Sequence, residues 1–375
     1  METTFKITTN EFLRELQSVG AVINPKMTIP ALTYIYCELA GNKLLLIGNN
    51  SEQQVETSIE VLEPTGDISF LIEKEIIGIL KTLPEQPLKI IIDADKSSML
   101  LEHSSGDFKF KIQDVDTYPK LKVIQSEEKD IITLPAGRFK SGIEKNSKQM
   151  ADDELRPVMN GVFVDIMEDK IVFVGSDGHR LSKYTDMALS GNAKNSFLLP
   201  RNTVPVLIKQ LSLVDSEQDI QIEINSRNVS IEIDEVKITT RLIEGRYPNY
   251  DSVIPKANDK FLVIDSKELS TIIARLLITS NNMKAICIKT DQKQTIFSSE
   301  DLDYAKSAKE YTDYKCNGDI TIGLKGTFLF DILSNLSGDI QFSFSEPMRA
   351  VLINPVEQIE NTDYTLLIMP MMLNN

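Results

Sequence analysis

Apolar residues form one pattern that occurs three times along the chain. A short apolar run that passes into helical spacing begins at Phe70, again 127 residues later at Phe197, and again 125 residues later at Ile322. Each copy predicts a short strand that leads into a helix. Self-similarity at a nearly fixed period indicates repeated structural units. The chain is therefore predicted to contain three similar parts.

Alternating apolar and polar residues predict antiparallel strand pairs in each part. The residue pairs Asn42-Lys43, Asp169-Lys170 and Gln292-Lys293 interrupt such alternating runs and are predicted hairpin turns. A period of two residues is typical of sheets with one buried face. Each third of the chain is then predicted to hold about eight short strands.

Capping residues and apolar spacing predict the helices. Thr9 or Asn10 can cap a first helix, and Asp265 or Ser266 can cap its equivalent in the last third. Pro135 suits the first turn of the corresponding central helix. Six helices are expected, within residues 9–20, 72–83, 135–149, 200–212, 266–280 and 324–336. Two helices covering antiparallel sheets in each third make an α+β fold.

The length of 375 residues suits two or three domains. A charged, polar stretch covers residues 125–128, and a second polar stretch covers residues 255–258. Boundaries between domains usually fall in such segments. We therefore expect domains over residues 1–125, 126–255 and 256–375.

Composition limits the chemistry that the chain can perform. Only two histidines, His103 and His179, occur, and the three cysteines lack C-x-x-C spacing. A multi-histidine or cysteine metal site is therefore not expected, nor is a cofactor. Free cysteines fit a reducing cytoplasm. No apolar run approaches the ~18 residues of a membrane-spanning helix, and the chain begins with no secretory signal pattern. We expect a cytoplasmic protein without membrane contact.

The net charge of −15 is unevenly distributed along the chain. The six helix windows contain twelve basic and seven acidic residues, so together they carry a charge of +5. Such a protein repels nucleic acid over most of its surface but can attract a polyanion along its helices. A single helix lysine is more often simply solvated, so only the collective asymmetry indicates a polyanionic partner.

The chain resembles the bacterial sliding clamp family, the beta subunit of DNA polymerase III, over its full length. The resemblance rests on residues 156–161, 176–181, 197–201, 244–250, 253–255 and 369–371. It implies three similar domains per chain and a ring of two chains joined head to tail. Such a ring encircles duplex DNA without reading its sequence and has no catalytic activity. It tethers the DNA polymerase III catalytic subunit for processive synthesis, and it also binds the clamp loader and other proteins with a clamp-binding motif.

The resemblance also implies a peptide-binding groove between the second and third domains. The matching positions are Arg156, Met159, Ser176, Gly178, His179, Arg180, Leu181, Pro248, Val253, Leu367, Met369, Pro370 and Met371. Methionine is flexible and polarisable, which suits a groove that accepts several peptides. The alternative is that the tail is an edge strand whose methionines fill the core, with Ile368 pointing inward. Met372 stands where the family commonly has arginine, and Asn374 and Asn375 extend past the usual end.

The implied ring joint aligns with Phe110 and Ile112 on one side and with Ile278 on the other. Alternating apolar residues around Phe110 suit an exposed edge strand that a partner strand covers. The alternative is an internal strand with Phe110 in its own core. For DNA, the candidates are basic residues of the helices and of one loop: Lys26, Lys74, Arg138, Lys140, Lys145, Lys148, Arg201, Lys209 and Arg275.

Two other functions fit parts of the sequence. Asp177 and His179 suggest a hydrolase, but catalysis would need a nucleophile or a metal placed beside His179, and no second histidine is nearby in the sequence, so a polar turn that frames a groove is favoured. Three repeats can also form a scaffold that binds peptides without closing into a ring. The number of chains per particle and the retention on closed DNA circles distinguish the clamp from the scaffold.

Overall fold

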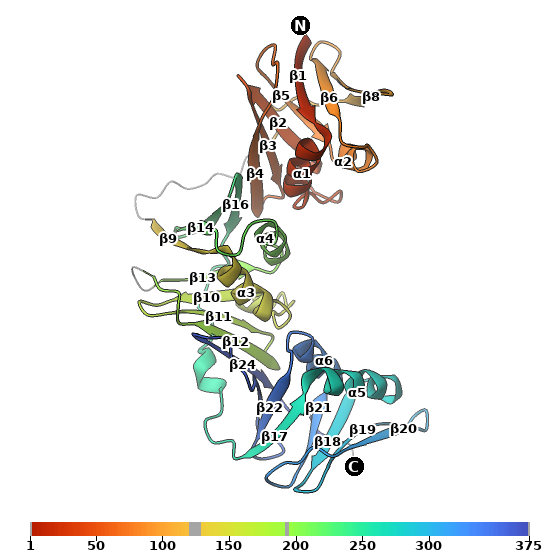
Figure 1. Ribbon diagram of the computed structural model, residues 1–375, viewed down its shortest axis with the longest axis vertical. Helices are drawn as coiled ribbons and strands as arrows, with labels where there is room; N and C mark the ends of the chain where they lie inside the picture. Colours follow the sequence, from red (N-terminus) through yellow and green to blue (C-terminus); the bar gives the residue numbers. More distant parts are fainter. Residues whose placement is uncertain (1, 120–128, 192–194, 374–375) are drawn as a thin grey trace. The chain divides into compact units, whose positions relative to one another are not determined.

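The computed structural model describes residues 2–119, 129–191 and 195–373, and it consists of two compact units (Figure 1). Unit 1 comprises Met1–Lys140 and Pro205–Leu242, and unit 2 comprises Ser141–Val204 and Ile243–Asn375. The described residues form 24 strands and six α-helices. The helices are α1 (Thr9–Gly20), α2 (Ile76–Leu80), α3 (Ala136–Ser147), α4 (Val204–Leu211), α5 (Ser266–Thr279) and α6 (Gly326–Leu333).

Unit 1 contains two antiparallel sheets. The smaller has the strand order β1-β6-β7-β8, and the larger has the order β5-β2-β3-β4-β16-β15-β14-β9. The larger sheet joins the first third of the chain to the central third, because β4 pairs with β16 and places Val55 opposite Ile238. The strands are β1 (Glu2–Thr8), β2 (Tyr34–Ala40), β3 (Lys43–Asn49), β4 (Gln53–Glu60), β5 (Ile68–Glu73), β6 (Pro87–Asp93), β7 (Ser98–His103), β8 (Gly106–Lys111), β9 (Asp130–Pro135), β14 (Asp219–Ile224), β15 (Asn228–Ile233) and β16 (Val236–Arg241).

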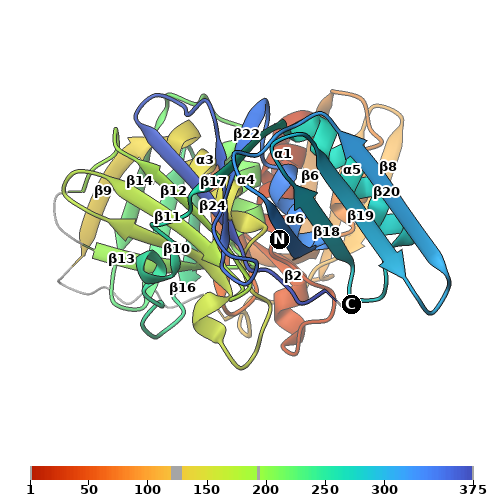
Figure 2. The same cartoon turned by 90° about the horizontal axis from the view of Figure 1, so that it is seen from below.

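Unit 2 repeats this arrangement. Its larger sheet has the order β13-β10-β11-β12-β24-β23-β22-β17, and its smaller sheet has the order β20-β19-β18-β21. The pairing of β12 with β24, with Leu181 opposite Leu367, joins the central third to the last third. Figure 2 shows β18, β19 and β20 as neighbouring strands. The strands are β10 (Gly161–Ile166), β11 (Ile171–Ser176), β12 (Arg180–Asp186), β13 (Asn195–Pro200), β17 (Lys260–Asp265), β18 (Ala285–Thr290), β19 (Thr295–Asp301), β20 (Lys306–Thr312), β21 (Ile320–Lys325), β22 (Asp339–Phe344), β23 (Val351–Pro355) and β24 (Thr362–Ile368).

The predicted threefold repeat is confirmed in the residues that the structure describes. The groups β1–β8, β9–β16 and β17–β24 each combine with two α-helices, as the pattern of eight strands and two helices predicted. The predicted hairpin turns lie at the connections β2–β3, β10–β11 and β18–β19. The compact units cross the thirds because each eight-stranded sheet takes strands from two of them.

The helix starts agree with the prediction at α5 but not at α1. Asp265 caps α5 by accepting the Glu268 N–H at 2.8 Å. At α1 the predicted cap at Thr9 or Asn10 is wrong, because Thr8 is the cap: its hydroxyl accepts the Glu11 N–H at 3.4 Å and donates to the Glu11 carboxylate at 2.7 Å. Threonine followed three residues later by glutamate is a capping box, and it places the start one residue earlier.

The helices pack on the sheets through one apolar stripe each. In unit 1, α1 lies against β3 and β4 and buries Leu16 and Val19. In unit 2, α5 lies against β19 and β20, buries Leu269 and Ile273, and packs beside α6 (Figure 1). This packing leaves the opposite, polar helix faces exposed. None of the described helices is long and apolar enough to cross a membrane.

Two equivalent glycines let helix ends approach the strand backbone. A Cβ atom on Gly48 of β3 would lie 1.9 Å from the Val19 carbonyl oxygen, and one on Gly175 of β11 would lie 2.2 Å from that of Asn146. Gly175 lies 127 positions after Gly48, and Asn146 lies 127 positions after Val19. In the last third of the chain, β19 has Ser299, whose hydroxyl donates to the Leu276 carbonyl of α5 at 2.9 Å. The repeat therefore preserves the helix–sheet contact by two different means.

Candidate peptide-binding surface and basic helix residues

The polar turn predicted around Asp177 connects β11 to β12. The Asp177 carboxylate accepts the backbone N–H groups of His179 at 2.9 Å and of Arg180 at 3.0 Å. The Ser176 hydroxyl donates to the Arg180 carbonyl at 2.9 Å, and Gly178 has a φ of 86°, which favours glycine. The turn is thus held by its own side chains, and Asp177 serves as a turn residue.

Arg180 is a buried structural residue. Its side chain is 9% exposed, and its guanidinium donates to Asp177 at 3.0 Å and to Asp331 of α6 at 2.7 Å. The same group donates to the Lys148 carbonyl, just beyond α3, at 2.9 Å and lies 4.3 Å from the centre of the Phe328 ring. A charged group that donates from all three of its nitrogens in this way fixes three elements to one another. Arg180 therefore supports the surface from beneath.

Arg156 contacts this turn, and His179 belongs to it. Arg156 donates to Asp153 at 2.8 Å and to the Asp177 carbonyl at 3.4 Å, and a Cβ atom on Gly178 would lie 2.7 Å from its guanidinium. The exposed His179 ring stacks on Phe328 of α6 with 6.3 Å between ring centres. No group of three or more potential metal ligands occurs in the described parts of the chain.

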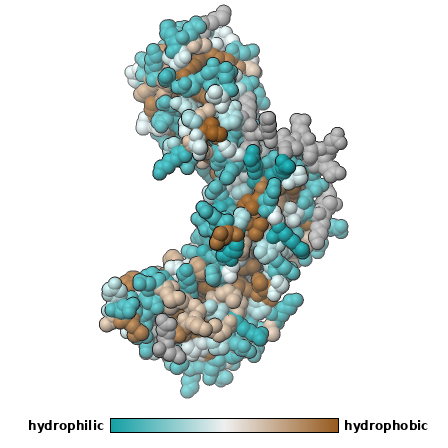
Figure 3. Space-filling model, turned by 180° about the vertical axis from the view of Figure 1, so that it is seen from behind, coloured by the Kyte–Doolittle hydropathy of each residue, from teal (hydrophilic) through white to brown (hydrophobic). Residues whose placement is uncertain are grey.

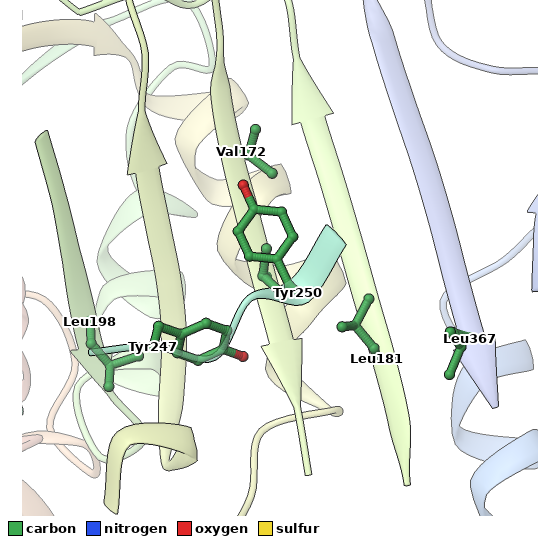
Figure 4. Close-up of a cluster of buried hydrophobic side chains, with 7 residues drawn as sticks. Val172, Leu181, Leu198, Tyr247, Tyr250 and Leu367 are labelled. Carbon is green, nitrogen blue, oxygen red and sulfur yellow. The ribbon is translucent and has the colours of Figure 1, made fainter. Parts of the chain in front are cut away.

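Several residues predicted to line the groove are part of a buried cluster in unit 2. Leu181 and Leu367 are 4% and 3% exposed and belong to a cluster with Val172, Tyr247 and Tyr250 (Figure 4). The Tyr250 hydroxyl donates to Asp165 at 2.8 Å, and burial together with this carboxylate raises the pKa of Tyr250. The segment around Tyr250 thus covers the apolar face of β11 and β12.

Only part of the predicted set is open to solvent. Met159 and Ser176 are 7% and 8% exposed, so with Leu181 and Leu367 they support the surface from inside. Val253 is 54% exposed and Met369 is 43% exposed, and Pro248 is also exposed. The face in Figure 3 likewise shows small apolar islands among hydrophilic residues. We call His179, Pro248, Val253 and Met369 the rim residues.

The tail does not form the edge strand of the alternative prediction. β24 lies inside its sheet, between β12 and β23, and Ile368 is buried as that alternative expected. The methionines that follow do not fill the core. The Met369 N–H donates to the His179 carbonyl at 2.8 Å, and Met372 is 76% exposed. Asn374 and Asn375 lie outside the described residues.

Among the nine predicted DNA contacts, Arg275, Arg201 and Lys145 are held by ion pairs, hydrogen bonds or ring contacts within the chain, and Lys74 and Lys148 also donate hydrogen bonds there. Arg275 forms a two-point ion pair with Glu310 of β20, and Arg201 donates to the Ala151 carbonyl at 3.0 Å. The Lys145 ammonium lies 4.8 Å from the centre of the Tyr364 ring, and burial lowers the pKa of Lys145. These interactions compete with phosphate binding, so the three residues are weaker candidates than the sequence suggested.

The other predicted basic residues differ in exposure. Lys26, Lys148 and Lys209 are exposed, whereas Arg138 and Lys140 are half-buried. Lys74 donates to the Ile23 carbonyl at 3.0 Å, and burial and the nearby positive charge of Lys209 lower the pKa of Lys74. Repulsion between two cations favours an anion beside them.

The predicted joint residues are placed differently from one another. β8 is the last strand of its sheet, and Phe110 is half-buried on it. Ile112 follows the strand and is only 5% exposed. Ile278 on α5 is 78% exposed. Sequence reasoning missed Tyr311, which is 67% exposed on the outermost strand β20. The sequence signal that could have identified Tyr311 is its position in a polar, alternating run, which is typical of an exposed strand.

Comparisons with known proteins cover nearly the whole chain. The family models of the DNA polymerase III beta subunit match residues 3–122 for the N-terminal domain, 133–249 for the central domain and 251–372 for the C-terminal domain. The beta sliding clamp of Haemophilus influenzae is 25% identical over 98% of this chain and 100% of the relative, and that of Escherichia coli K12 is 24% identical over 96% and 95%.

Solved structures show the same fold. The DNA polymerase III beta subunit of Thermotoga maritima matches with a TM-score of 0.91 at 20% identity, covering 99% of this chain and 100% of that one. The sliding clamp of Bacillus subtilis matches with a TM-score of 0.89 at 20% identity, covering 100% of both chains. Because all three domain models match in order from one end to the other, the chain belongs to the DNA polymerase III beta subunit family, the beta sliding clamps that act as non-catalytic processivity factors.

Proposed function

We propose that two copies of this chain join head to tail into a ring that encircles duplex DNA in the cytoplasm. The ring comprises three clamp domains per chain, over residues 1–125, 126–255 and 256–375. The observation that carries the proposal is that the smaller sheet of each unit has an outermost strand to which another chain can pair. These strands are β8 in unit 1 and β20 in unit 2. An uncovered edge strand is a template for pairing with another chain. Pairing β8 of one copy with β20 of the other closes the ring at two equivalent joints.

Apolar side chains support these joints. Phe110 on β8 is half-buried, whereas Tyr311 on β20 and Ile278 on the last turn of α5 stand in solvent. Since α5 packs on β20, Ile278 and Tyr311 belong to one part of unit 2. Burying large apolar groups at the centre of an interface supplies most of its binding energy.

Ile278→Asp is expected to weaken the dimer by about 100-fold, because a carboxylate would be buried in the joint without a partner. Light scattering after gel filtration should then give the mass of one chain, 42.2 kDa, where the unchanged protein gives twice that mass. Val356→Asp is the matched control, since Val356 is a similarly exposed apolar residue in the loop after β23. A dimer that survives Ile278→Asp unchanged would contradict the proposed joint.

The size of such a ring suits duplex DNA. Twelve helices of about 10 Å diameter around a circle leave a hole of about 28 Å. A duplex passes through such a hole with a layer of water around it. Basic side chains that reach phosphates only intermittently hold no fixed position on the DNA and read no bases. The ring can therefore slide, while its closed shape prevents its loss.

The exposed lysines are expected to contribute to loading rather than to retention. Changing Lys148 and Lys209 together to glutamine should slow loading onto primed DNA by about threefold to tenfold at low salt, since steering depends on charge. Lys289→Gln is the control, because this exposed lysine lies on strand β18, whereas Lys209 lies on α4 and Lys148 directly follows α3. Loading rates are measured by fluorescence with a clamp loader and ATP. An equal effect of all three changes would count against specific helix contacts.

We further propose that partner proteins bind the rim residues with a short linear peptide. The DNA polymerase III catalytic subunit and the clamp loader are the expected partners, as are other proteins with a clamp-binding motif. The support is the exposed Met369 beside His179, above the apolar cluster that contains Leu181. Flexible methionines allow one surface to accept several peptides.

A further inference from the structure

The tail of the chain connects the two sheets of unit 2. The Met369 N–H extends the pairing of β24 with β12 by donating to the His179 carbonyl at 2.8 Å. Two residues later, the Met371 N–H donates to the Gly323 carbonyl of β21 at 2.8 Å. Pro370, between them, has no N–H to donate. We call residues 369–373 the strap, because they leave the larger sheet and join the outer edge of the smaller one.

Gly323 provides the space in which the strap lies. A Cβ atom on Gly323 would lie 2.7 Å from Leu373 Cδ2, 2.8 Å from Leu373 Cγ and 2.7 Å from the Met371 carbonyl oxygen. Gly323 has no positive φ, so its backbone conformation is open to any residue. Glycine is therefore needed here for the close approach of the strap and not for conformational freedom.

The strap holds its outward side chains in place through this contact. Met369 and Met372 are exposed, whereas Leu373 is half-buried at Gly323. A segment fixed at His179 and at Gly323 has lost most of its conformational freedom before any partner arrives. Such preorganisation strengthens binding, because the ordering cost is not incurred on association.

We propose that Gly323 is a positioning residue for partner binding. Because it has no side chain, Leu373 can pack closely against it, and this contact holds Met369 and Met371 in the positions at which a partner peptide binds. The inference rests on the proposed peptide-binding function of the rim residues. It adds a residue that lies beneath the strap and outside the predicted groove set.

Gly323→Val tests the proposal in the full-length protein. The variant is expected to bind a fluorescein-labelled peptide with the clamp-binding motif about tenfold more weakly, by anisotropy. Hydrogen exchange at the Met371 amide should rise at least about tenfold, because the added side chain displaces the strap and so breaks the hydrogen bond to the carbonyl of residue 323. Thr321→Val is the matched control, since this exposed residue lies two positions earlier on β21. It should leave both measurements unchanged.

Leu373→Ala provides a second variant that cannot disturb the sheet. It should also weaken the binding of the same peptide. It should have no further effect in the Gly323→Val background, since both changes remove the same contact between Leu373 and Gly323. If Gly323→Val binds the peptide with full affinity although exchange at the Met371 amide has risen, the positioning role is overturned and the peptide surface is not. The same holds if exchange at the Met371 amide does not change. Failure of the unchanged protein to bind the peptide would instead refute the proposed peptide surface, and this role with it.

Discussion

Protein loaded onto nicked circular duplex DNA should remain bound at least about tenfold longer than protein on the same DNA after it is cut into a linear form. The expected cause is the closed ring, whose loss from a circle requires a joint to open. On linear DNA the ring slides off an end. The measurement is co-elution of labelled protein and DNA on gel filtration, after loading with a clamp loader and ATP and before and after restriction cleavage.

Salt provides a control for this retention. Raising the ionic strength weakens phosphate contacts but leaves a topological link unchanged, so the circle-bound fraction should persist. The Ile278→Asp variant should be lost from circular and linear DNA alike, because its joint is weakened. Equal loss of the unchanged protein from both forms of DNA would refute encirclement and would favour a scaffold that binds peptides only.

Removal of residues 369–375 should weaken the binding of a polymerase peptide by about 100-fold and abolish stimulation of the polymerase. The deletion removes Met369 from the rim and both attachments of the strap, at His179 and Gly323. It leaves β24, which ends at Ile368, inside its sheet. The truncated protein should therefore remain a dimer, because neither β8 nor β20 is altered.

A shorter truncation separates the strap from the chain end. Removing only residues 374–375 should leave the peptide affinity within about twofold, since terminal residues tolerate change unless they are packed. The two truncations are compared by anisotropy with one labelled peptide and by the length of DNA that the polymerase synthesises. A polymerase that is stimulated equally by the longer truncation would rule out the proposed peptide surface.

The elements and their repeat were predictable because they depend on local patterns. Alternation around Asp169-Lys170 and apolar spacing in residues 266–280 report directly which face of a strand or helix is buried. The capping box at Thr8 and Glu11 was also present in the sequence, and it was missed because Thr9 and Asn10 are equally good caps by type.

The use of individual charged residues was not predictable, because it depends on partners far away in the sequence. Arg180 pairs with Asp331, 151 residues later, and Arg275 pairs with Glu310, 35 residues later. Neither pairing leaves a local pattern. The burial of Ile112 likewise depends on where the strand β8 ends, and strand ends are poorly marked in a sequence. Family resemblance identifies such positions without revealing whether they face solvent.

The shared eight-stranded sheets restrict how the chain can be divided into pieces. A fragment containing only the central third would have lost β4 from beside β16 and β24 from beside β12. The N–H and C=O groups along one edge of β16 and of β12 would then have no strand to pair with. Side chains that are buried against the missing strands would also be exposed. Such fragments are prone to aggregation. A piece that keeps its large sheet whole must contain β4 together with β16, or β12 together with β24.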